Sequence, residues 1–118
     1  HGNGELATKA MYCAYEKGKF WEAHDLLMTE KAYDFINNVV KNDPAQSGKM
    51  ADFLKSANIA DLKSCLDSGK YDARLAADMS LGASLGVSGT PGFFVNETNF
   101  AGAYSFKDME SLVTSALK

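Results

Sequence analysis

The sequence predicts an α/β chain in which a block of five or six helices is followed by an antiparallel β-hairpin and a C-terminal helix. Three observations predict this order. Apolar side chains recur at helical spacing from Leu6 to Leu85. Two short apolar runs, 92–95 and 100–103, then flank a polar turn, and a helix-capping pattern follows at Ser105. We therefore expect a helical block over residues 1–85 and a β-β-α portion over 86–118.

Composition excludes several classes of function. The 118 residues are 46% hydrophobic and 23% charged, which is ordinary for a globular chain that buries a core. A net charge of -3 gives no basic surface for nucleic acid, so no nucleic-acid partner is expected. No apolar run approaches the roughly 20 residues that a membrane span needs. The first residues lack a signal-peptide pattern, so we expect that a targeting segment was removed or that the gene product begins earlier.

The first half of the helical block divides at a glycine. Leu6, Ala10 and Cys13 form one apolar stripe, and Gly18 is placed to end that helix. A second helical pattern begins at Phe20 and continues to Asn42. It has two adjacent apolar stripes, which predicts a well-buried helix; the stripes are Phe20, Ala23 and Leu27, and Trp21, His24 and Met28.

The second half of the block contains three further predicted helices. Asp43 followed by Pro44 is a typical helix start, as is Asn58 with Asp61 three residues later. The helix from Asn58 carries Cys65 on its inner face and ends at Gly69. A longer helix then runs from Lys70 to Gly86.

The predicted hairpin raises a question of stability. A two-stranded hairpin alone is marginal in water. The run Phe93-Phe94-Val95 is apolar without alternation, as in a strand covered on both faces. Ser105 and Asp108 form a capping box for the last helix, whose apolar face includes Leu112 and Leu117. The sequence therefore predicts a sheet of which some strands lie outside these residues.

Most polar residues have a structural interpretation. Cys13 and Cys65 are 52 positions apart and form no Cys-x-x-Cys unit, and with two histidines at no ligand spacing we expect no metal site. His24 is expected to bond a neighbour or to contribute to packing, and Glu16 to lie on a solvated helix face. No glycine-rich phosphate loop is present, and no cofactor is expected.

Pro91 directly precedes the first strand. A trans proline that merely starts a strand is the better interpretation on local grounds, because cis bonds are a small minority of X-Pro bonds in folded proteins. A cis bond would leave backbone groups of Gly89 and Thr90 free to pair with an extended peptide.

Longer segments of the sequence favour the cis form of the Thr90–Pro91 bond instead, through a resemblance to a known family. The stretches "AMYCAYEKGKFWEAHDLL", "CLDSGKYDARLAADMSLGASLGVSGTP" and "GVSGTPGFFVN" resemble DsbA-like thiol:disulfide oxidoreductases of the thioredoxin superfamily. The resemblance covers essentially the whole chain. It implies a partial thioredoxin-like fold, with a helical insertion followed by the last two strands and the last helix. Gly92 is a departure, because Thr or Ser is common there in the family.

The resemblance also implies a function. Thr90-Pro91 would be cis, and a substrate-binding loop of Val87, Ser88, Gly89, Thr90 and Pro91 would face the redox disulfide. The family's Cys-x-x-Cys would precede residue 1, so this chain has no catalytic residue and is expected to be inactive alone. The intact protein would exchange disulfides with cysteine-containing proteins and a redox partner in an extracytoplasmic compartment. Oxidase, isomerase and reductase directions remain open.

In that context a structural disulfide between Cys13 and Cys65 is expected, since both lie on inner helix faces and such families occupy oxidising compartments. Two reduced core thiols are the alternative. Two other functional classes also stay open: a non-catalytic peptide-binding module, and a relative of kappa-class glutathione transferases. The hairpin is expected to be completed by the upstream portion or by another copy of the chain.

Overall fold

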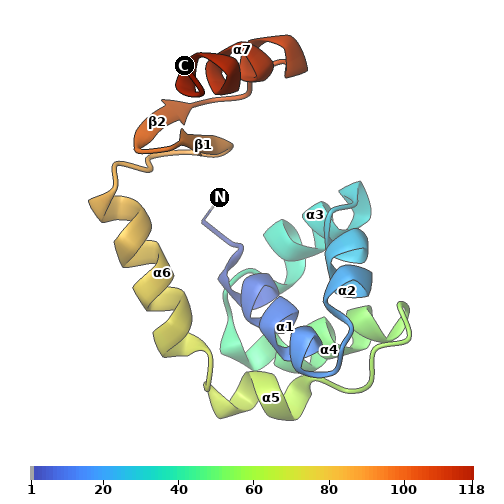
Figure 1. Ribbon diagram of the computed structural model, residues 1–118. Helices are drawn as coiled ribbons and strands as arrows, with labels where there is room; N and C mark the ends of the chain where they lie inside the picture. The colour runs from blue at the N-terminus through green and yellow to red at the C-terminus, as the bar shows by residue number, and fades with distance from the viewer. Residues whose placement is uncertain (1) are drawn as a thin grey trace. The chain divides into compact units, whose positions relative to one another are not determined.

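The computed structural model describes residues 2–118, which form two compact units (Figure 1). One unit extends to Ala76, and the other comprises Ala77–Lys118. The division falls inside a single helix, α6 (Asp72–Ser84). The expected boundary at 85/86, placed where the sequence pattern changes, stays a prediction. The fold class is confirmed: helices are followed by a two-stranded antiparallel sheet and a C-terminal helix.

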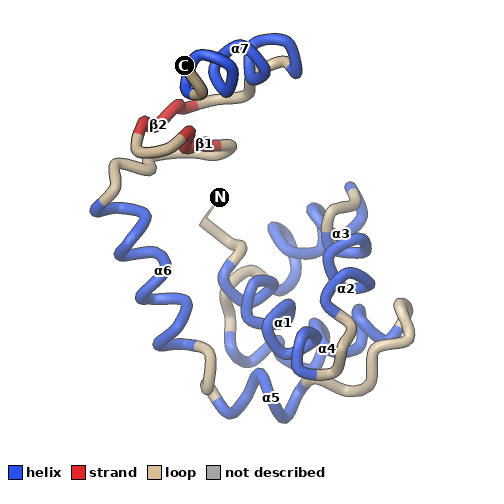
Figure 2. The backbone as a smooth tube through the Cα atoms, viewed as in Figure 1, coloured by secondary structure: helices blue, strands red, loops and turns tan. Residues whose placement is uncertain are grey.

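The first unit is helical (Figure 2). Its elements are α1 (Glu5–Glu16), α2 (Phe20–Leu27), α3 (Glu30–Phe35), a π-helical turn η1 (Ile36–Val40), a 3-10 turn η2 (Pro44–Gln46), α4 (Ser47–Lys55), α5 (Lys63–Ser68) and the start of α6. Asp43 accepts a hydrogen bond from the N–H of Ala45, so it caps η2 as its sequence position predicts.

One core holds this unit together. The apolar stripe of α1 is buried as predicted, with Ala10 and Ala14 fully enclosed. It packs in one cluster with Met50 and Leu54 of α4. The second apolar stripe of α2 was wrongly predicted to be buried. Trp21 is 67% exposed and Met28 66%, because the single stripe of Ala23 and Leu27 suffices to attach this short helix.

Two helix boundaries differ from the sequence prediction. The pattern from Phe20 to Asn42 is interrupted at Thr29, whose hydroxyl accepts a hydrogen bond from Ala32 N–H at 3.1 Å and starts α3. Asn58 does not start a helix. It has a left-handed φ of 59°, and α5 begins only at Lys63, whose N–H bonds Asp61 Oδ1 at 2.9 Å. In both places a local side-chain bond outweighs helical periodicity.

The sheet of the second unit has one tight turn. β1 (Gly92–Val95) pairs antiparallel with β2 (Thr98–Ala101), with Val95 opposite Thr98. The second strand was predicted at 100–103 and lies two residues earlier, because Asn96 adopts a φ of 54° and closes a two-residue turn. Helix α7 (Phe106–Ala116) follows, and Ser105 accepts the N–H of Asp108 at 3.1 Å, as the capping box predicts.

The second unit has almost no interior. No residue from Ala77 to Lys118 is buried in the part of the chain that the structure describes. Phe106 is 83% exposed, Leu117 82% and Phe94 43%. The face of α7 that was expected to be buried, and the strand expected to be covered on both sides, are therefore at most half-buried, and much of their apolar surface is open to solvent. Apolar surface of this extent marks a place where another element normally packs.

Truncation of Leu54 should destabilise the helical unit strongly. This side chain is fully buried at the centre of the core. We expect Leu54→Ala to lower the free energy of unfolding by about 3 kcal/mol, because it removes buried surface and leaves a cavity. Leu81→Ala is the control, since Leu81 is 57% exposed and its loss should change little. Urea unfolding followed by circular dichroism measures both; equal effects would contradict the assigned core.

Candidate functional site

The segment Val87–Pro91 lies between α6 and β1 and is exposed along its whole length. Gly86, with a φ of 82°, ends α6, and Val87 N–H closes the helix by bonding Gly82 C=O at 2.9 Å. The Thr90–Pro91 peptide bond is cis. Seven residues, 85–91, therefore carry the chain from the last residue of α6 through this exposed loop to the first residue of β1.

Hydrogen bonds fix both ends of this loop, one to a residue of β2 and the other to the residue directly after β2. Asn99 Nδ2 donates to Gly86 C=O at 3.2 Å, and Gly102 N–H donates to Pro91 C=O at 3.0 Å. Between these anchors, the backbone groups of Ser88, Gly89 and Thr90 make no hydrogen bond to any residue from 2 to 118. The loop thus presents unpaired backbone donors and acceptors beside a sheet, which is the arrangement that binds an extended peptide.

The side chains of the loop leave this backbone accessible. A Cβ added at Gly89 would meet no atom within 4 Å, and one at Gly92 would lie 3.5 Å from the carbonyl oxygen of Gly89. Gly92 could therefore be Thr or Ser, as is common in the family that the sequence resembles, without a steric clash. The five predicted substrate-binding residues are contiguous and exposed, and their binding role stays a prediction.

The two cysteines form a disulfide. The bond joins α1 to α5 across 52 positions with a Cα–Cα distance of 6.0 Å. The pairing is the one expected, and reduced core thiols are not found. Cys13 is 1% exposed, whereas Cys65 is partly exposed and so less enclosed than its helical stripe predicts.

An unexpected charged cluster lies beside this disulfide. Glu16 Oε2 is 3.4 Å from Cys65 Sγ, and Glu16 Oε1 accepts a hydrogen bond from Lys70 Nζ. The Lys70 bond holds the pKa of the Glu16 carboxyl below its ordinary value, and the pKa of the Lys70 ammonium is raised in return. Desolvation raises the pKa of the Tyr71 phenol, and the nearby Glu16 carboxylate raises it further. The Tyr71 ring stacks on Tyr12 at 5.1 Å between centroids.

Sequence reasoning placed Glu16 on a solvated face and missed this cluster. A usable signal was present, since Glu16 follows Cys13 by one helical turn and so shares its side of α1. One ligand atom each from Cys13, Glu16 and Cys65 lies within 4.8 Å of the others. The two sulfurs are bonded to one another, however, and metals bind thiolates. The oxidised form therefore offers no thiolate ligands at this position.

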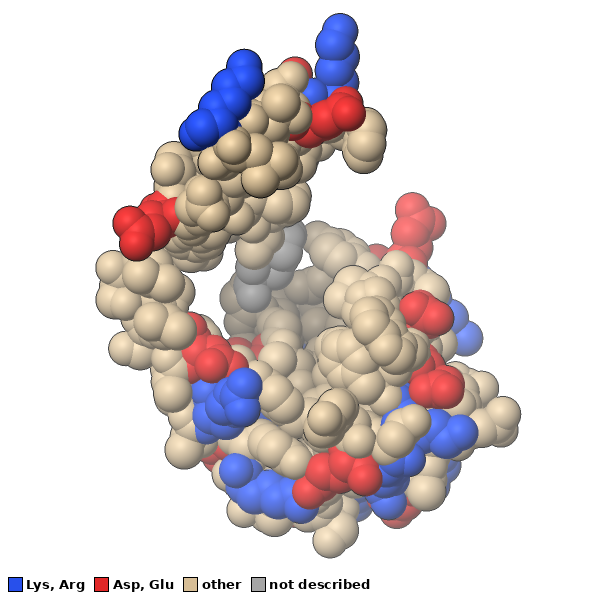
Figure 3. All heavy atoms as spheres, viewed as in Figure 1, with Lys and Arg blue, Asp and Glu red and all other residues tan. Residues whose placement is uncertain are grey.

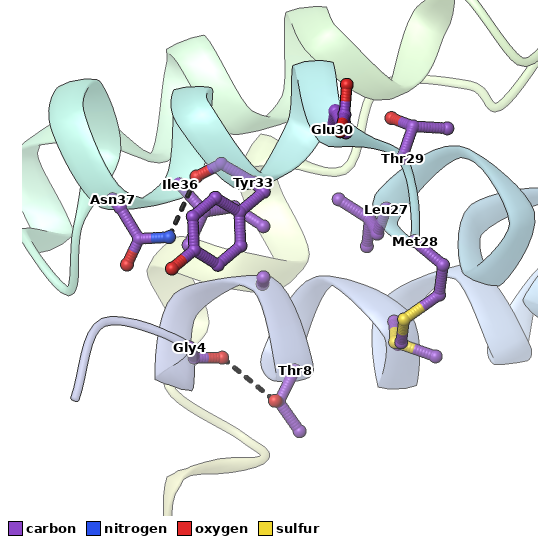
Figure 4. Close-up of a pocket in the computed structure, with 11 residues that line it drawn as sticks. Gly4, Thr8, Leu27, Met28, Thr29, Glu30, Tyr33, Ile36 and Asn37 are labelled. Atoms are coloured by element: carbon purple, nitrogen blue, oxygen red, sulfur yellow. Dashed lines mark hydrogen bonds between the residues drawn. The ribbon is translucent and has the colours of Figure 1, made fainter. Parts of the chain in front are cut away.

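A hollow lies among α1, α2, α3 and η1 of the helical unit, with a volume of about 460 Å³ (Figure 4). Its wall is mainly apolar and includes Met11, Met28 and Ile36. Its polar side chains are engaged locally: Thr8 Oγ1 donates to Gly4 C=O, and Asn37 Nδ2 donates to Tyr33 C=O, both at 2.8 Å. The hollow has room for an apolar side chain but presents no arrangement of catalytic groups.

The remaining polar residues form no catalytic constellation on the described surface. His24 Nδ1 lies 3.1 Å from Asp25 Oδ1, and its ring packs edge-on to Trp21 at 5.2 Å, in agreement with the predicted packing role. Figure 3 shows acidic and basic side chains interspersed over the visible face of the helical unit, without a broad basic patch. No helix among residues 2–118 is both long enough and apolar enough to cross a membrane.

Comparison with known proteins gives one family and two relatives. A family model described as thioredoxin matches residues 2–115. The Na(+)/H(+) antiporter NhaA 3 of Salinispora tropica is 31% identical over 121 residues, and NhaA 1 of Salinispora arenicola is 34% identical over 124. Each alignment covers 98% of this chain and 16% of the relative, so the chain spans about a sixth of the length of these proteins. No solved structure matches it.

Proposed function

This chain belongs to the thioredoxin family, and from that membership we propose that it is the substrate-facing, C-terminal portion of a DsbA-like thiol:disulfide oxidoreductase. The intact protein forms or exchanges disulfides in cysteine-containing substrate proteins, and it is regenerated by a redox partner. The family match supports the superfamily, and the resemblance of "GVSGTP" and the helical segments supports the DsbA-like assignment.

The observation that carries this proposal is the exposed loop Val87–Pro91. Its ends are fixed at Gly86 and Pro91, while the backbone groups of Ser88, Gly89 and Thr90 make no hydrogen bond within the described residues. In the proposed function a substrate segment lies along this loop as an additional strand and pairs with these groups. Backbone pairing of this kind accepts many sequences, as a general disulfide-exchange protein requires.

The nucleophile of the proposed reaction comes from a segment that precedes this chain. The 118 residues contain no Cys-x-x-Cys, and both cysteines are held in the disulfide between α1 and α5. Upstream, a low-pKa cysteine at a helix N-terminus would attack or leave a mixed disulfide with the substrate. The open apolar faces of β1 and α7 support this arrangement, because further strands and helices of the same protein would cover them.

The same proposal includes an extracytoplasmic location. Disulfides persist in oxidising compartments and are rare in the cytosol, where thiol buffers reduce them. The closed Cys13–Cys65 bond is the observation that supports this location.

A non-catalytic peptide-binding module is the second candidate function. It is favoured by the antiporter names of the two relatives, which align with this chain over only 16% of their length. In this alternative the chain is an accessory domain of a longer membrane transport protein, and the loop Val87–Pro91 holds a peptide without exchanging disulfides.

Gly89→Val tests the loop in the full gene product. A side chain at this position has open space within the chain, so the fold should tolerate it, but it would occupy the space of a paired substrate strand. We expect a rise in KM for oxidation of a reduced dithiol peptide of about tenfold, equivalent to the loss of roughly one good contact. Gly2→Val is the control, because a Cβ there also meets nothing within 4 Å. An unchanged KM in Gly89→Val would remove the loop from the substrate site.

A further inference from the structure

The Cys13–Cys65 disulfide has one enclosed and one accessible side. Cys13 is 1% exposed and lies in the apolar core with Ala10 and Leu54. Cys65 is partly exposed on α5, near the surface of the unit. Exchange begins when a thiolate reaches one sulfur of the bond, and access decides which sulfur is attacked. An external thiol therefore approaches the bond more readily from the side of Cys65 than from the side of Cys13.

Charged groups surround the accessible sulfur. The carboxylate oxygen Glu16 Oε2 is in contact with Cys65 Sγ at 3.4 Å, and Lys70 Nζ binds the other oxygen of the same carboxylate. One oxygen of the negatively charged carboxylate thus lies at the sulfur, and the other is bonded to the lysine ammonium. The Lys70 bond holds the Glu16 side chain in this position although the side chain is 37% exposed.

We propose that Cys65 Sγ is a thiol-exchange site of its own, open to attack from one side and selective for cationic or neutral thiols over anionic ones because the Glu16 carboxylate flanks the sulfur. The site is independent of the Val87–Pro91 loop and of any upstream Cys-x-x-Cys.

The exchange uses two equivalents of an external thiol. A thiolate RS⁻ attacks Cys65 Sγ, the bond to Cys13 Sγ breaks, and Cys13 leaves as a thiolate that takes a proton from water. A second RS⁻ attacks the R sulfur of the mixed disulfide, which releases the Cys65 thiolate and RSSR. The two external thiols supply the two electrons that reduce the protein disulfide. An anionic attacker must approach the Glu16 carboxylate in the first step, and this repulsion slows it.

Reduction kinetics of the 118-residue chain test the proposal without substitutions. Cysteamine, 2-mercaptoethanol and 2-mercaptoethanesulfonate carry positive, zero and negative charge. We expect second-order rate constants, corrected for the thiolate fraction of each reagent and for its thiol basicity, to fall in that order by about two- to fivefold per step at low salt. Mass spectrometry after acid quenching should place the first mixed disulfide on Cys65. Equal corrected rates, or an adduct on Cys13, would overturn the proposal.

The substitution Glu16→Gln distinguishes the electrostatic effect of the carboxylate from the effect of the exposure of Cys65. It retains the shape of the side chain and removes its negative charge from the sulfur, so the preference for cationic thiols should vanish. Glu22→Gln is the matched control on an exposed face of α2, and it should keep the order of the wild type. Retention of the full order in Glu16→Gln would show that this carboxylate does not select the attacking thiol.

Discussion

Replacing both Cys13 and Cys65 by alanine is expected to lower the free energy of unfolding of the helical unit by about 4 kcal/mol. The bond closes a loop of 52 positions between α1 and α5, and it restricts the unfolded chain over most of the unit. Cys13 is also buried, so its truncation adds a small packing loss. Urea unfolding of the helical signal measures the difference.

Chemical reduction provides the control for this double substitution. The wild-type chain kept reduced by a neutral thiol should lose nearly as much stability as the double variant, because both lose the same cross-link. A double variant within about 0.5 kcal/mol of the oxidised wild type would mean that the disulfide does not constrain the unfolded chain as the loop model requires.

The two units are expected to differ by at least about a thousandfold in amide hydrogen exchange. Amides of α1 and α4 belong to a unit with a buried core and open only with a cost of several kcal/mol. Residues 77–118 bury no side chain among those described, and an 11-residue helix such as α7 is marginal in isolation. Exchange measured by mass spectrometry in the isolated 118-residue chain should therefore be fast in β1, β2 and α7.

The same measurement on the full gene product is the control. If upstream strands cover the apolar faces of β1 and α7, protection of these segments should rise there to the level of the helical unit. Slow exchange of β1 and β2 in the isolated chain would contradict the account, because it would show that the hairpin needs no further strands.

Local signals in the sequence predicted local structure well. Ser105 caps α7, Gly92–Val95 is a strand, and the stripe from Leu6 to Cys13 is buried, because each depends on residues close together in the chain. The interruption at Thr29 and the left-handed Asn58 were missed, since periodicity alone does not show when a side-chain bond replaces a helical one.

The candidate sites likewise differ in whether their residues are close together in the sequence. The loop Val87–Pro91 was predicted from the resemblance of the contiguous motif "GVSGTP", and its binding role stays a prediction. The contact of Glu16 with Lys70 joins residues 54 positions apart, and no spacing rule reaches across α1 and the end of α5. The exposure of α7 was also beyond the sequence: its apolar face predicts a partner, and only the structure shows that none of its residues is buried by the described part of the chain.

Oxidation of a reduced dithiol peptide tests the central claim most directly, with the full gene product and the 118-residue chain assayed side by side. We expect the full product to catalyse oxidation and the isolated chain to give only the uncatalysed rate, because the proposed function places the exchanging Cys-x-x-Cys outside these residues. Catalysis by the isolated chain, or a full product with no activity in either the oxidising or the reducing direction, would contradict the assignment as part of a thiol:disulfide oxidoreductase.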